Sequence, residues 1–380
     1  MMVQSRPPSH NRNPVRLCEL ETPCLIADRA RTERNARRMD ALARRRGVEL
    51  RPHMKTAKSA DVCAIALAGR RLSVTVATAD EAWHFLDAGI TDIRWAVALT
   101  RNKHDLCKRL LAAGANLSVI VSDEVSARDL ADAFDDHSER IDALVEIDCG
   151  EHRTGFAPDS AELTVAAALL ADANGVNMRG VLTHGGHSYG ASGVDEIARI
   201  AADERAAVVT AANRLESRGI PCPERSIGST PTIVHGDHLT DITEIRPGVY
   251  LFGDLFQMQL GACALDDIAV TVLATVIGVD PENNRFVIDA GGLALSKDRS
   301  TEASPTDYGY GLVTRLDGSE LPGAPIVTVV YQEHGTVEGG QPLPFGELQV
   351  GSQVRVLPNH SCMTAAPYEC YYVVSGSSDR

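Results

Sequence analysis

The sequence predicts an α/β protein in which a (β/α)8 TIM barrel is followed by a smaller antiparallel β domain. Three observations support this fold class. About eight short β-branched or apolar runs alternate with Ala- and Leu-rich segments of helical period up to about residue 256. Polar residues cluster directly after these runs, as they do at the carboxyl ends of barrel strands. Beyond residue 256 the apolar runs are separated by turn-rich segments that contain no long helical stretch.

The N-terminal half opens with a candidate strand over 21–28 and a helix rich in Arg and Ala, which we expect to end at Gly47 as a C-cap. Near-continuously apolar strands that alternate with helices imply a parallel sheet, and a count near eight favours a closed barrel over an open doubly wound sheet. The predicted barrel strands lie at 48–55, 73–78, 92–99, 117–123, 143–148, 179–184, 224–230 and 244–252, with the clearest helices at 79–89, 103–114 and 194–219.

The chain divides into three predicted parts. Residues 1–20 form an N-terminal segment that is a candidate to join the β domain, residues 21–256 form the barrel, and residues 257–380 form the β domain. The strands expected in the β domain lie at 268–280, 285–292, 326–335, 352–362 and 370–374.

Composition restricts the partners and the compartment. A formal net charge of -14 argues against nucleic acid and anionic membranes, because both need a basic face, although a local basic pocket for a small anion remains compatible with it. We find neither an apolar run of signal-peptide length nor one long enough to span a bilayer, so we expect a cytoplasmic protein. The 9 cysteines are odd in number and form no CxxC, which favours reduced thiols.

The stretch 48–58 joins a short apolar strand to a basic cluster that contains Arg51, His53, Lys55 and Lys58. A lysine just past the end of a buried strand faces the mouth of a barrel, where low dielectric and neighbouring cations favour a nucleophilic amine. This is the position of a Schiff-base lysine. The alternative from the residues alone is a solvated basic loop.

Two loops after the late strands carry further candidates. The run SIGSTPT (226–232) has a glycine and hydroxyls whose backbone amides suit a phosphate, and an ordinary turn is its alternative. The run THGGHSY (183–189) supplies two imidazoles and a phenol. His184 and Tyr189 are candidates for ligand contact, with a hydrogen-bonded structural histidine and a core aromatic as the alternatives.

Arg153 stands in a glycine-bounded loop, EIDCGEHRTG (146–155), directly after a predicted strand. An arginine there suits a substrate carboxylate, or lies beside a ring nitrogen and keeps that nitrogen unprotonated. A surface ion pair with Glu146 or Glu151 is the alternative.

The sharpest signal in the C-terminal part is LPNHSCMTA (357–365). His360 and Cys362, two residues apart at the end of a strand, are expected to point to one side and to hold a metal ion through nitrogen and thiolate, a ligand set that zinc favours. Two protein ligands leave positions for water and substrate. Inert packing is the alternative for the cysteine. The run YQEHG (331–335) supplies outer partners of this metal or forms a turn.

The motifs occur along the chain in the order RPHMKTAK, EIDCGEHRTG, THGGHSY, GSTPT, EIRPGVYLFGD, QEHG and LPNHSC. Each is short, but the ordered set resembles the metal-dependent branch of the alanine racemase-like, fold type III pyridoxal-phosphate enzymes. That branch includes D-threonine aldolases, eukaryotic-type D-serine dehydratases and D-threo-3-hydroxyaspartate dehydratases. The resemblance extends from Glu21 to the last strand and favours the functional interpretation of each loop.

The resemblance implies that the barrel binds pyridoxal 5'-phosphate and that the β domain carries the metal. It also implies a homodimer in which the second domain of one subunit covers the barrel of the other. Lys55 would be the Schiff-base residue and Arg153 would lie near the pyridine nitrogen. Zinc is the favoured metal on His360 and Cys362, with manganese, cobalt or magnesium as alternatives. The remaining cofactor-binding residues that it implies are His53, His184, Tyr189, Gly228, Ser229 and Thr230.

Two features select a sub-branch. Aldolases of the family pair the metal histidine with an aspartate two residues on, whereas dehydratases use cysteine, so Cys362 favours a dehydratase, as does the GSTPT loop. The implied activity is a lyase reaction on a D-β-hydroxy amino acid, such as D-serine or D-threo-3-hydroxyaspartate, that releases a 2-oxo acid and ammonia.

Two alternatives remain from the sequence. One is aldolase cleavage of the same kind of substrate to glycine and an aldehyde. The other is a non-catalytic pyridoxal-phosphate-binding protein, against which the C-terminal domain and the HSC run argue. For a second substrate carboxylate, Arg51 and Arg299 are candidates on charge alone.

Overall fold

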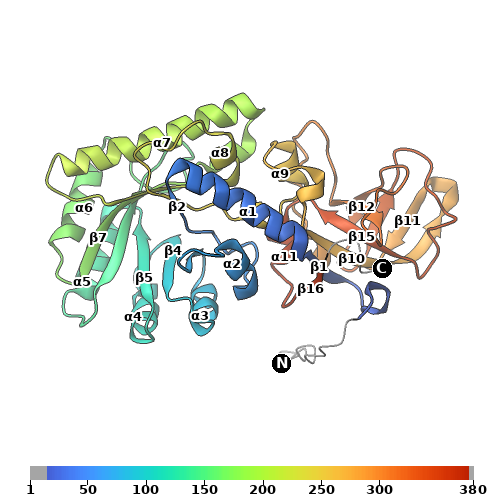
Figure 1. Cartoon of the computed structure of the whole chain (residues 1–380), viewed down its shortest axis with the longest axis horizontal. Coiled ribbons are helices and arrows are strands. Elements are labelled where there is room, and N and C mark those ends of the chain that lie inside the picture. The colour runs from blue at the N-terminus through green and yellow to red at the C-terminus, as the bar shows by residue number, and fades with distance from the viewer. Residues whose placement is uncertain (1–14, 376–380) are drawn as a thin grey trace.

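A computed structural model describes residues 15–375, which form two lobes: a barrel with its surrounding helices, and a β-rich lobe beside it (Figure 1). The barrel consists of eight parallel strands in the spatial order β2-β9-β8-β7-β6-β5-β4-β3. An isolated parallel bridge between His53 and Thr75 joins the two ends of this order and closes the barrel. The predicted barrel is therefore confirmed, with strands β2 (Glu49–Leu50), β3 (Ser73–Val76), β4 (Asp92–Ala98), β5 (Asn116–Val121), β6 (Ile141–Glu146), β7 (Val176–Leu182), β8 (Glu224–Ile227) and β9 (Glu244–Ile245).

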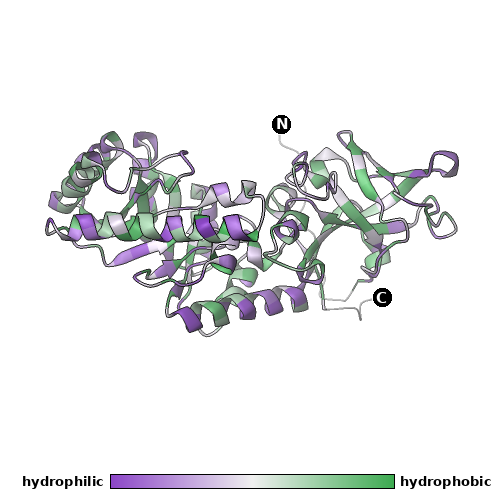
Figure 2. Cartoon of the chain, turned by 90° about the horizontal axis from the view of Figure 1, so that it is seen from above, coloured by the Kyte–Doolittle hydropathy of each residue, from purple (hydrophilic) through white to green (hydrophobic). Residues whose placement is uncertain are grey.

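Helices cover the outside of the barrel and show mixed hydrophilic and hydrophobic positions along their length (Figure 2). Gly47 ends the first helix in the left-handed conformation, with φ 67°, as predicted. The helices of this part of the chain are α1 (Arg29–Arg46), α2 (Ala60–Ala66), α3 (Ala79–Asp87), α4 (His104–Ala112), α5 (Glu124–Phe134), α6 (Ala161–Asp172), α7 (Val194–Glu216), α8 (Thr230–His235) and α9 (Leu255–Gln259). Short 3-10 turns lie at η1 (Leu17–Glu19), η2 (Arg101–Lys103), η3 (Gly186–Gly190), η4 (Val249–Leu251), η5 (Leu265–Asp267) and η6 (Pro281–Asn283).

The second lobe is a small β-barrel in which β10, β11, β14, β13, β12 and β15 pair in sequence and β15 pairs back to β10. All of these pairings are antiparallel, as predicted. Two short strands, β12 and β14, were not predicted, because each is brief and follows a turn. The strands are β10 (Val270–Asp280), β11 (Arg285–Ile288), β12 (Gly311–Arg315), β13 (Ile326–Val330), β14 (Gly335–Glu338), β15 (Gln353–Pro358) and β16 (Tyr372–Val374), with helices α10 (Gly292–Leu295) and α11 (Ser361–Ala365).

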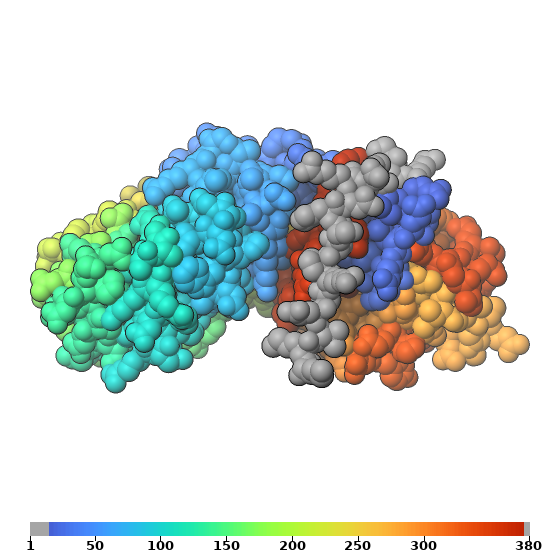
Figure 3. Space-filling model, turned by 90° about the horizontal axis from the view of Figure 1, so that it is seen from below, coloured from blue at the N-terminus to red at the C-terminus, as the bar shows by residue number. Residues whose placement is uncertain are grey.

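The N-terminal strand β1 (Cys24–Asp28) belongs to the second lobe, although it falls in the range 21–256 that the sequence assigns to the barrel. It pairs antiparallel with β10 and parallel with β16. All five of its residues are buried, which a strand between two neighbours requires. The first described residues, drawn in dark blue, accordingly lie beside the orange and red atoms of the C-terminal lobe in the space-filling view (Figure 3). The other domain boundaries stay predictions.

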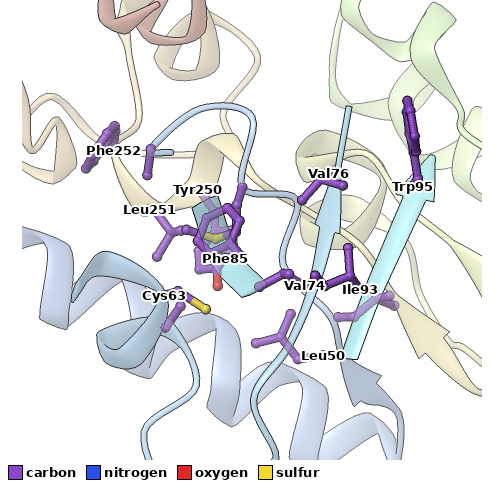
Figure 4. Close-up of a cluster of buried hydrophobic side chains, with 14 of the residues drawn as sticks. Leu50, Cys63, Val74, Val76, Phe85, Ile93, Trp95, Tyr250, Leu251 and Phe252 are labelled. Carbon is purple, nitrogen blue, oxygen red and sulfur yellow. The ribbon is translucent and has the colours of Figure 1, made fainter. Parts of the chain in front are cut away.

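One hydrophobic core extends from the barrel into the second lobe. Figure 4 shows the part of it where Tyr250, Leu251 and Phe252, just after β9, lie beside side chains of the first barrel strands and helices. Tyr371 continues this contact, since its ring meets Phe252 edge-on and its hydroxyl donates to the carbonyl of Ala57. The shared core holds the C-terminal lobe against the turn that follows β2.

Among the residues described, no helix combines the length and apolar character that a membrane span requires. All nine cysteines lie in the described range and none forms a disulfide, as their number and spacing predict.

Candidate active site

A cavity of about 820 Å³ lies at the carboxyl ends of the barrel strands and receives side chains from both lobes. It is the place where a (β/α)8 barrel carries its chemistry. All ten residues predicted for the site line this one cavity: His53, Lys55, Arg153, His184, Tyr189, Gly228, Ser229, Thr230, His360 and Cys362. The second lobe that lines the cavity is that of the same chain. The arrangement in which a partner's second domain covers the barrel stays a prediction.

Lys55 lies in the turn that leaves β2, with its side chain exposed to the cavity. Among the described residues its amine makes no ion pair with a carboxylate. His53 lies beside it, where burial, and then the positive charge of Lys55, hold the pKa of His53 well below its usual value. The loop after β9 packs on this turn so closely that a Cβ at Gly248 would come 2.4 Å from the carbonyl oxygen of His53. The basic cluster therefore forms part of the cavity wall rather than a free surface loop.

The Gly228–Thr230 loop joins β8 to α8. Gly228 has φ 155°, and a Cβ there would come 2.8 Å from the backbone nitrogen of Arg246, so the position accepts only glycine. Ser229 caps α8 by accepting a hydrogen bond from the backbone N–H of Thr232 at 3.2 Å. The Thr230 hydroxyl is buried and has no hydrogen-bond partner in the structure. A buried hydroxyl without a partner in a cavity wall suits a ligand oxygen.

His184 and Tyr189 follow β7 and form a second wall. The Nδ1 of His184 donates to the carbonyl of Gly228, while burial lowers the pKa of His184 to about 3, so the imidazole is neutral. Tyr189 stacks on Phe256 with ring centroids 6.0 Å apart. Burial also raises the pKa of Tyr189. His184 is thus a hydrogen-bonded histidine and a cavity residue at once.

Arg153 lines the cavity with a side chain that is 55% exposed. Its Nη1 lies 3.2 Å from Oε1 of Glu151, so the ion pair weighed as the alternative with Glu151 does form. Glu146, the other candidate partner, instead accepts a hydrogen bond from the Thr154 hydroxyl at 2.8 Å. The position of Arg153 beside a ring nitrogen stays a prediction.

The sequence predicted His360 and Cys362 at the end of one strand, but β15 ends at Pro358; His360 is the N-cap residue of α11 and Cys362 lies in the first turn of that helix. Both still line the cavity. Nδ1 of His360 lies 2.6 Å from Oδ2 of Asp298, and Sγ of Cys362 lies 3.0 Å from the hydroxyl oxygen of Thr56. Burial disfavours the charged imidazole, but the hydrogen bonds to Asp298 and Cys362 outweigh it and raise the pKa of His360 to about 11.

The metal donors available in the cavity are few. Within residues 15–375 no three His, Cys, Asp or Glu side chains are grouped so that they could share a metal ion. The His360 imidazole and the Cys362 thiol remain as a nitrogen and a sulfur donor at one wall. This donor set fits zinc, and a pair of protein ligands fits a catalytic metal with open positions better than a closed structural one.

Some cavity residues were not predicted. Arg246 is buried, donates to the carbonyl of Thr183 at 2.6 Å, and has its pKa lowered by burial to about 10. Lys58 lies 3.8 Å from Glu81 at another wall. Arg246 stands in the EIRPG run and Lys58 in the RPHMKTAK run, so both motifs carried a signal that sequence reasoning left unassigned.

Neither of the charge-based candidates for a second carboxylate, Arg51 and Arg299, lines the cavity. Arg51 pairs with Asp92 at 2.6 Å and with Glu244 at 2.7 Å, and it does not line the cavity. Arg299 pairs with Glu302 and Asp307 in the second lobe. The QEHG run forms an exposed turn between β13 and β14, outside the cavity lining, which favours the turn interpretation.

Comparison with known proteins decides the family. Residues 27–255 match the family described as alanine racemase, N-terminal domain, and residues 269–374 match the family described as putative serine dehydratase domain. The chain belongs to the alanine racemase-like, fold type III family. The resemblance found in the sequence is confirmed, and the two family matches fall one on each lobe.

Relatives in this family include two kinds of lyase. A D-threo-3-hydroxyaspartate dehydratase from Delftia sp. (strain HT23) is 37% identical over 94% of this chain and 95% of its own length. A D-serine dehydratase from Dictyostelium discoideum is 29% identical over 97% of each chain. A D-threonine aldolase from Arthrobacter sp. is 28% identical over 93% of this chain and 88% of its own.

Solved structures in the family agree with the fold. The Delftia dehydratase superposes with a TM-score of 0.92 at 37% identity, covering 95% of this chain and 96% of that one. A D-threo-3-hydroxyaspartate dehydratase in which a cysteine is replaced by alanine, in its metal-free form, also gives 0.92 at 36% identity over 96% and 97% of the two chains.

Proposed function

We propose that this protein is a pyridoxal-phosphate- and metal-dependent dehydratase of D-β-hydroxy amino acids such as D-serine or D-threo-3-hydroxyaspartate, which releases a 2-oxo acid and ammonia. The observation that carries the proposal is the convergence of Lys55, the Gly228–Thr230 loop and the His360–Cys362 pair on one cavity. This reaction needs an amine to hold the cofactor, a loop to bind its phosphate, and nitrogen and sulfur ligands for one metal ion.

The residues present fit the cofactor. The cavity volume of about 820 Å³ is within the range of small-molecule sites, roughly 300–1,000 Å³. Lys55 would hold the cofactor covalently, and the partnerless Thr230 hydroxyl with the backbone at Gly228 and Ser229 would hold its phosphate. Tyr189 would flank the ring.

The residues also fit a metal at the opposite wall, held by His360 and Cys362. When bound, pyridoxal phosphate supplies an electron sink for negative charge at Cα, and the metal supplies a Lewis acid for the β-hydroxyl, which is a poor leaving group. Lys55 takes the Cα proton with its amine. His53 and His184 stay uncharged through burial, so they add no positive charge beside that amine. The stacked rings of Tyr189 and Phe256 shield one side from water.

Dehydration is preferred to aldol cleavage for two reasons. Cys362 supplies the thiolate that the family resemblance associates with dehydratases, and the metal-free cysteine-to-alanine variant of a relative supports a cysteine in metal binding. Dehydratase relatives also share up to 37% identity over nearly the whole chain, compared with 28% for the D-threonine aldolase.

Product analysis tests the proposal. The protein is loaded with pyridoxal phosphate and zinc and incubated with a panel of D- and L-β-hydroxy amino acids, with and without a chelator, while oxo acid, ammonia and glycine are measured. We expect oxo acid and ammonia from D-substrates only, and their loss with chelator or with Cys362→Ala. Glycine with an aldehyde would identify an aldolase. A bound cofactor without turnover of any substrate would identify a binding protein.

A further inference from the structure

A carboxylate contacts the imidazole of His360, one of the two residues proposed to hold the metal. Asp298 follows α10, and its Oδ2 lies 2.6 Å from Nδ1 of His360. An ionised carboxylate can only accept a hydrogen bond, so Nδ1 of the imidazole must carry the proton. When the ring is neutral, as a metal ligand must be, the other nitrogen, Nε2, is then the one with a lone pair to offer. Asp298 is 62 residues before His360, and sequence reasoning found no signal for it.

Asp298 is itself held in place. The hydroxyl of Ser300 donates to its Oδ1 at 2.8 Å, and its own backbone N–H donates to the hydroxyl of Ser296 at 3.0 Å. Both carboxylate oxygens therefore have a partner, one in the loop and one on the imidazole. A carboxylate fixed in this way has one orientation to offer to His360.

The loop that carries Asp298 is locked to the strand end that carries His360. Asn359, the neighbour of His360, donates from Nδ2 to the Thr301 hydroxyl at 2.7 Å and accepts from the Thr301 backbone N–H at 3.2 Å. Both residues are fully buried. On the other side, the backbone N–H of Ser361 donates to Oδ2 of Asp254 at 2.9 Å, which ties the start of α11 to the barrel lobe. The backbone around His360 is fixed, and the ring orientation is the freedom that Asp298 removes.

We propose that Asp298 is a positioning residue for the metal site. It holds the tautomer of His360 that presents Nε2 to the cation, and it makes that nitrogen a stronger electron-pair donor to the metal. The proposal rests on the metal site of the proposed function. A carboxylate that accepts from the far nitrogen of a metal-bound histidine is a recurring arrangement, and it orients the ring and raises its basicity. Asp298 lies on the Nδ1 side of the ring, so it supports the ligand without being one.

Metal affinity tests the inference without an activity assay. Apo wild type and Asp298→Asn are titrated with zinc against a chromophoric chelator. The asparagine keeps the shape of the side chain, but its amide can donate a hydrogen bond to Nδ1. This stabilises the tautomer with the proton on Nε2, which cannot bind the metal there, so we expect zinc binding to weaken about 10- to 100-fold. Asp307→Asn is the matched control. It lies in the same region, with a side chain 36% exposed compared with 28% for Asp298, and it pairs with Arg299 rather than His360. We expect its zinc affinity to stay within about two-fold of wild type, because a surface ion pair contributes little.

Unchanged zinc affinity in Asp298→Asn, or an equal loss in both variants, overturns the inference, since an equal loss means that loop folding alone is responsible. A measurement on the wild type covers the case in which Asp298→Asn does not fold. Nitrogen-15 spectra of histidine-labelled protein, with His360 assigned from a His360→Gln variant, report the tautomer directly. We expect a proton on Nδ1 without zinc and the metal on Nε2 with it. A zinc-bound form in which Nδ1 holds the metal and Nε2 carries the proton overturns the inference.

The experiments distinguish a failure of the proposed metal site from a failure of the role of Asp298. If the wild type binds no zinc, or His360→Gln binds it unchanged, the metal site itself is wrong and the role of Asp298 falls with it. If the wild type binds zinc through His360 and Asp298→Asn binds it equally well, only the role of Asp298 is refuted.

Discussion

The two ends of the barrel use charge in opposite ways. Near the amino ends of the strands, Arg94 is almost fully buried and pairs with both Glu224 and Glu244. Arg51 pairs with Glu244 and Asp92 in the same interior network. At the carboxyl ends the cavity is lined by Lys55, Lys58, Arg153 and Arg246, and within residues 15–375 neither Lys55 nor Arg246 forms an ion pair with a carboxylate.

The paired charges at the amino ends stabilise the barrel, whereas the unpaired cations at the carboxyl ends are available to a ligand. A buried charge is tolerated when a partner of opposite sign offsets its loss of hydration, and the amino-end network meets that condition internally. Cations without such a partner at the cavity favour an anionic ligand, and a phosphate or an amino acid carboxylate provides that charge. The overall charge of -14 conceals this local excess of positive charge. Five perturbations should act on one end of the barrel and spare the other.

The largest expected effect is that of Lys55→Ala. It removes the amine proposed to hold the cofactor and to take the Cα proton, so turnover should fall by at least about a thousand-fold. The side chain makes no ion pair among the described residues, so the free energy of unfolding of the apo protein should change by less than about 0.5 kcal/mol. Oxo-acid release and urea unfolding measure the two quantities. Retained turnover would contradict the role of Lys55.

At the other end, Glu244→Gln should mainly reduce stability. It leaves Arg51 and Arg94 in the barrel interior without a shared carboxylate, which should lower the free energy of unfolding by about 3–5 kcal/mol, measured by urea denaturation. The control is Glu216→Gln, which breaks a half-exposed pair with Arg225 and should cost no more than about 1 kcal/mol. Equal losses in the two variants would contradict the contrast between buried and exposed pairs.

Acid should weaken the same network. Burial alone would raise the pKa of Glu244, but the charges of Arg94 and then Arg51 lower it from its usual 4.5 to about 2. A depressed carboxyl pKa contributes stability above the unfolded-state value, and this contribution is lost as pH falls from about 4.5 to about 2; its size is on the order of 3 kcal/mol. The stability difference between wild type and Glu244→Gln should therefore narrow over this range. A constant difference would show that the pairing is not electrostatic.

Gly228→Ala should act on the cavity. The added Cβ would meet the backbone nitrogen of Arg246 at 2.8 Å in a conformation that favours glycine, so the Gly228–Thr230 loop must shift. We expect pyridoxal phosphate to bind about ten-fold more weakly, a change of about 1.4 kcal/mol, as measured by equilibrium dialysis. Gly346→Ala, where nothing lies within 4 Å of the added Cβ, should leave the affinity unchanged.

The smallest expected effect is that of Thr56→Val, which removes the hydroxyl 3.0 Å from Sγ of Cys362. The loss of one hydrogen bond, about 1 kcal/mol, should weaken zinc binding about five-fold in a chelator titration. Thr314→Val removes a buried hydroxyl that donates to the carbonyl of Arg355 in the second lobe and should leave zinc affinity unaltered. A larger loss in Thr314→Val than in Thr56→Val would contradict a specific contact with the cysteine.

The sequence by itself determined the alternation of strands and helices and the presence of a second, antiparallel β lobe, and its motifs, with the family resemblance they carry, named the ten residues that line the cavity. The period of apolar residues is local and selects the element, and the eight cavity residues that follow parallel barrel strands must gather at one end of the sheet. His360 and Cys362 follow β15 in the second lobe, so only the packing of the two lobes brings them to that cavity. The helix end at Gly47 is also local and followed from a single residue.

Only the tertiary structure decided the rest. Five buried residues in β1 require two neighbours, but nothing in them specifies the second sheet rather than the barrel. The charge of Arg51 suggested a ligand contact until closure of the barrel brought Glu244 and Asp92 to it. Asp298 reaches His360 only because two loops 62 residues apart fold against each other. Contacts of this kind depend on which surfaces meet, and neither the period of a sequence nor the charge of a residue carries that information.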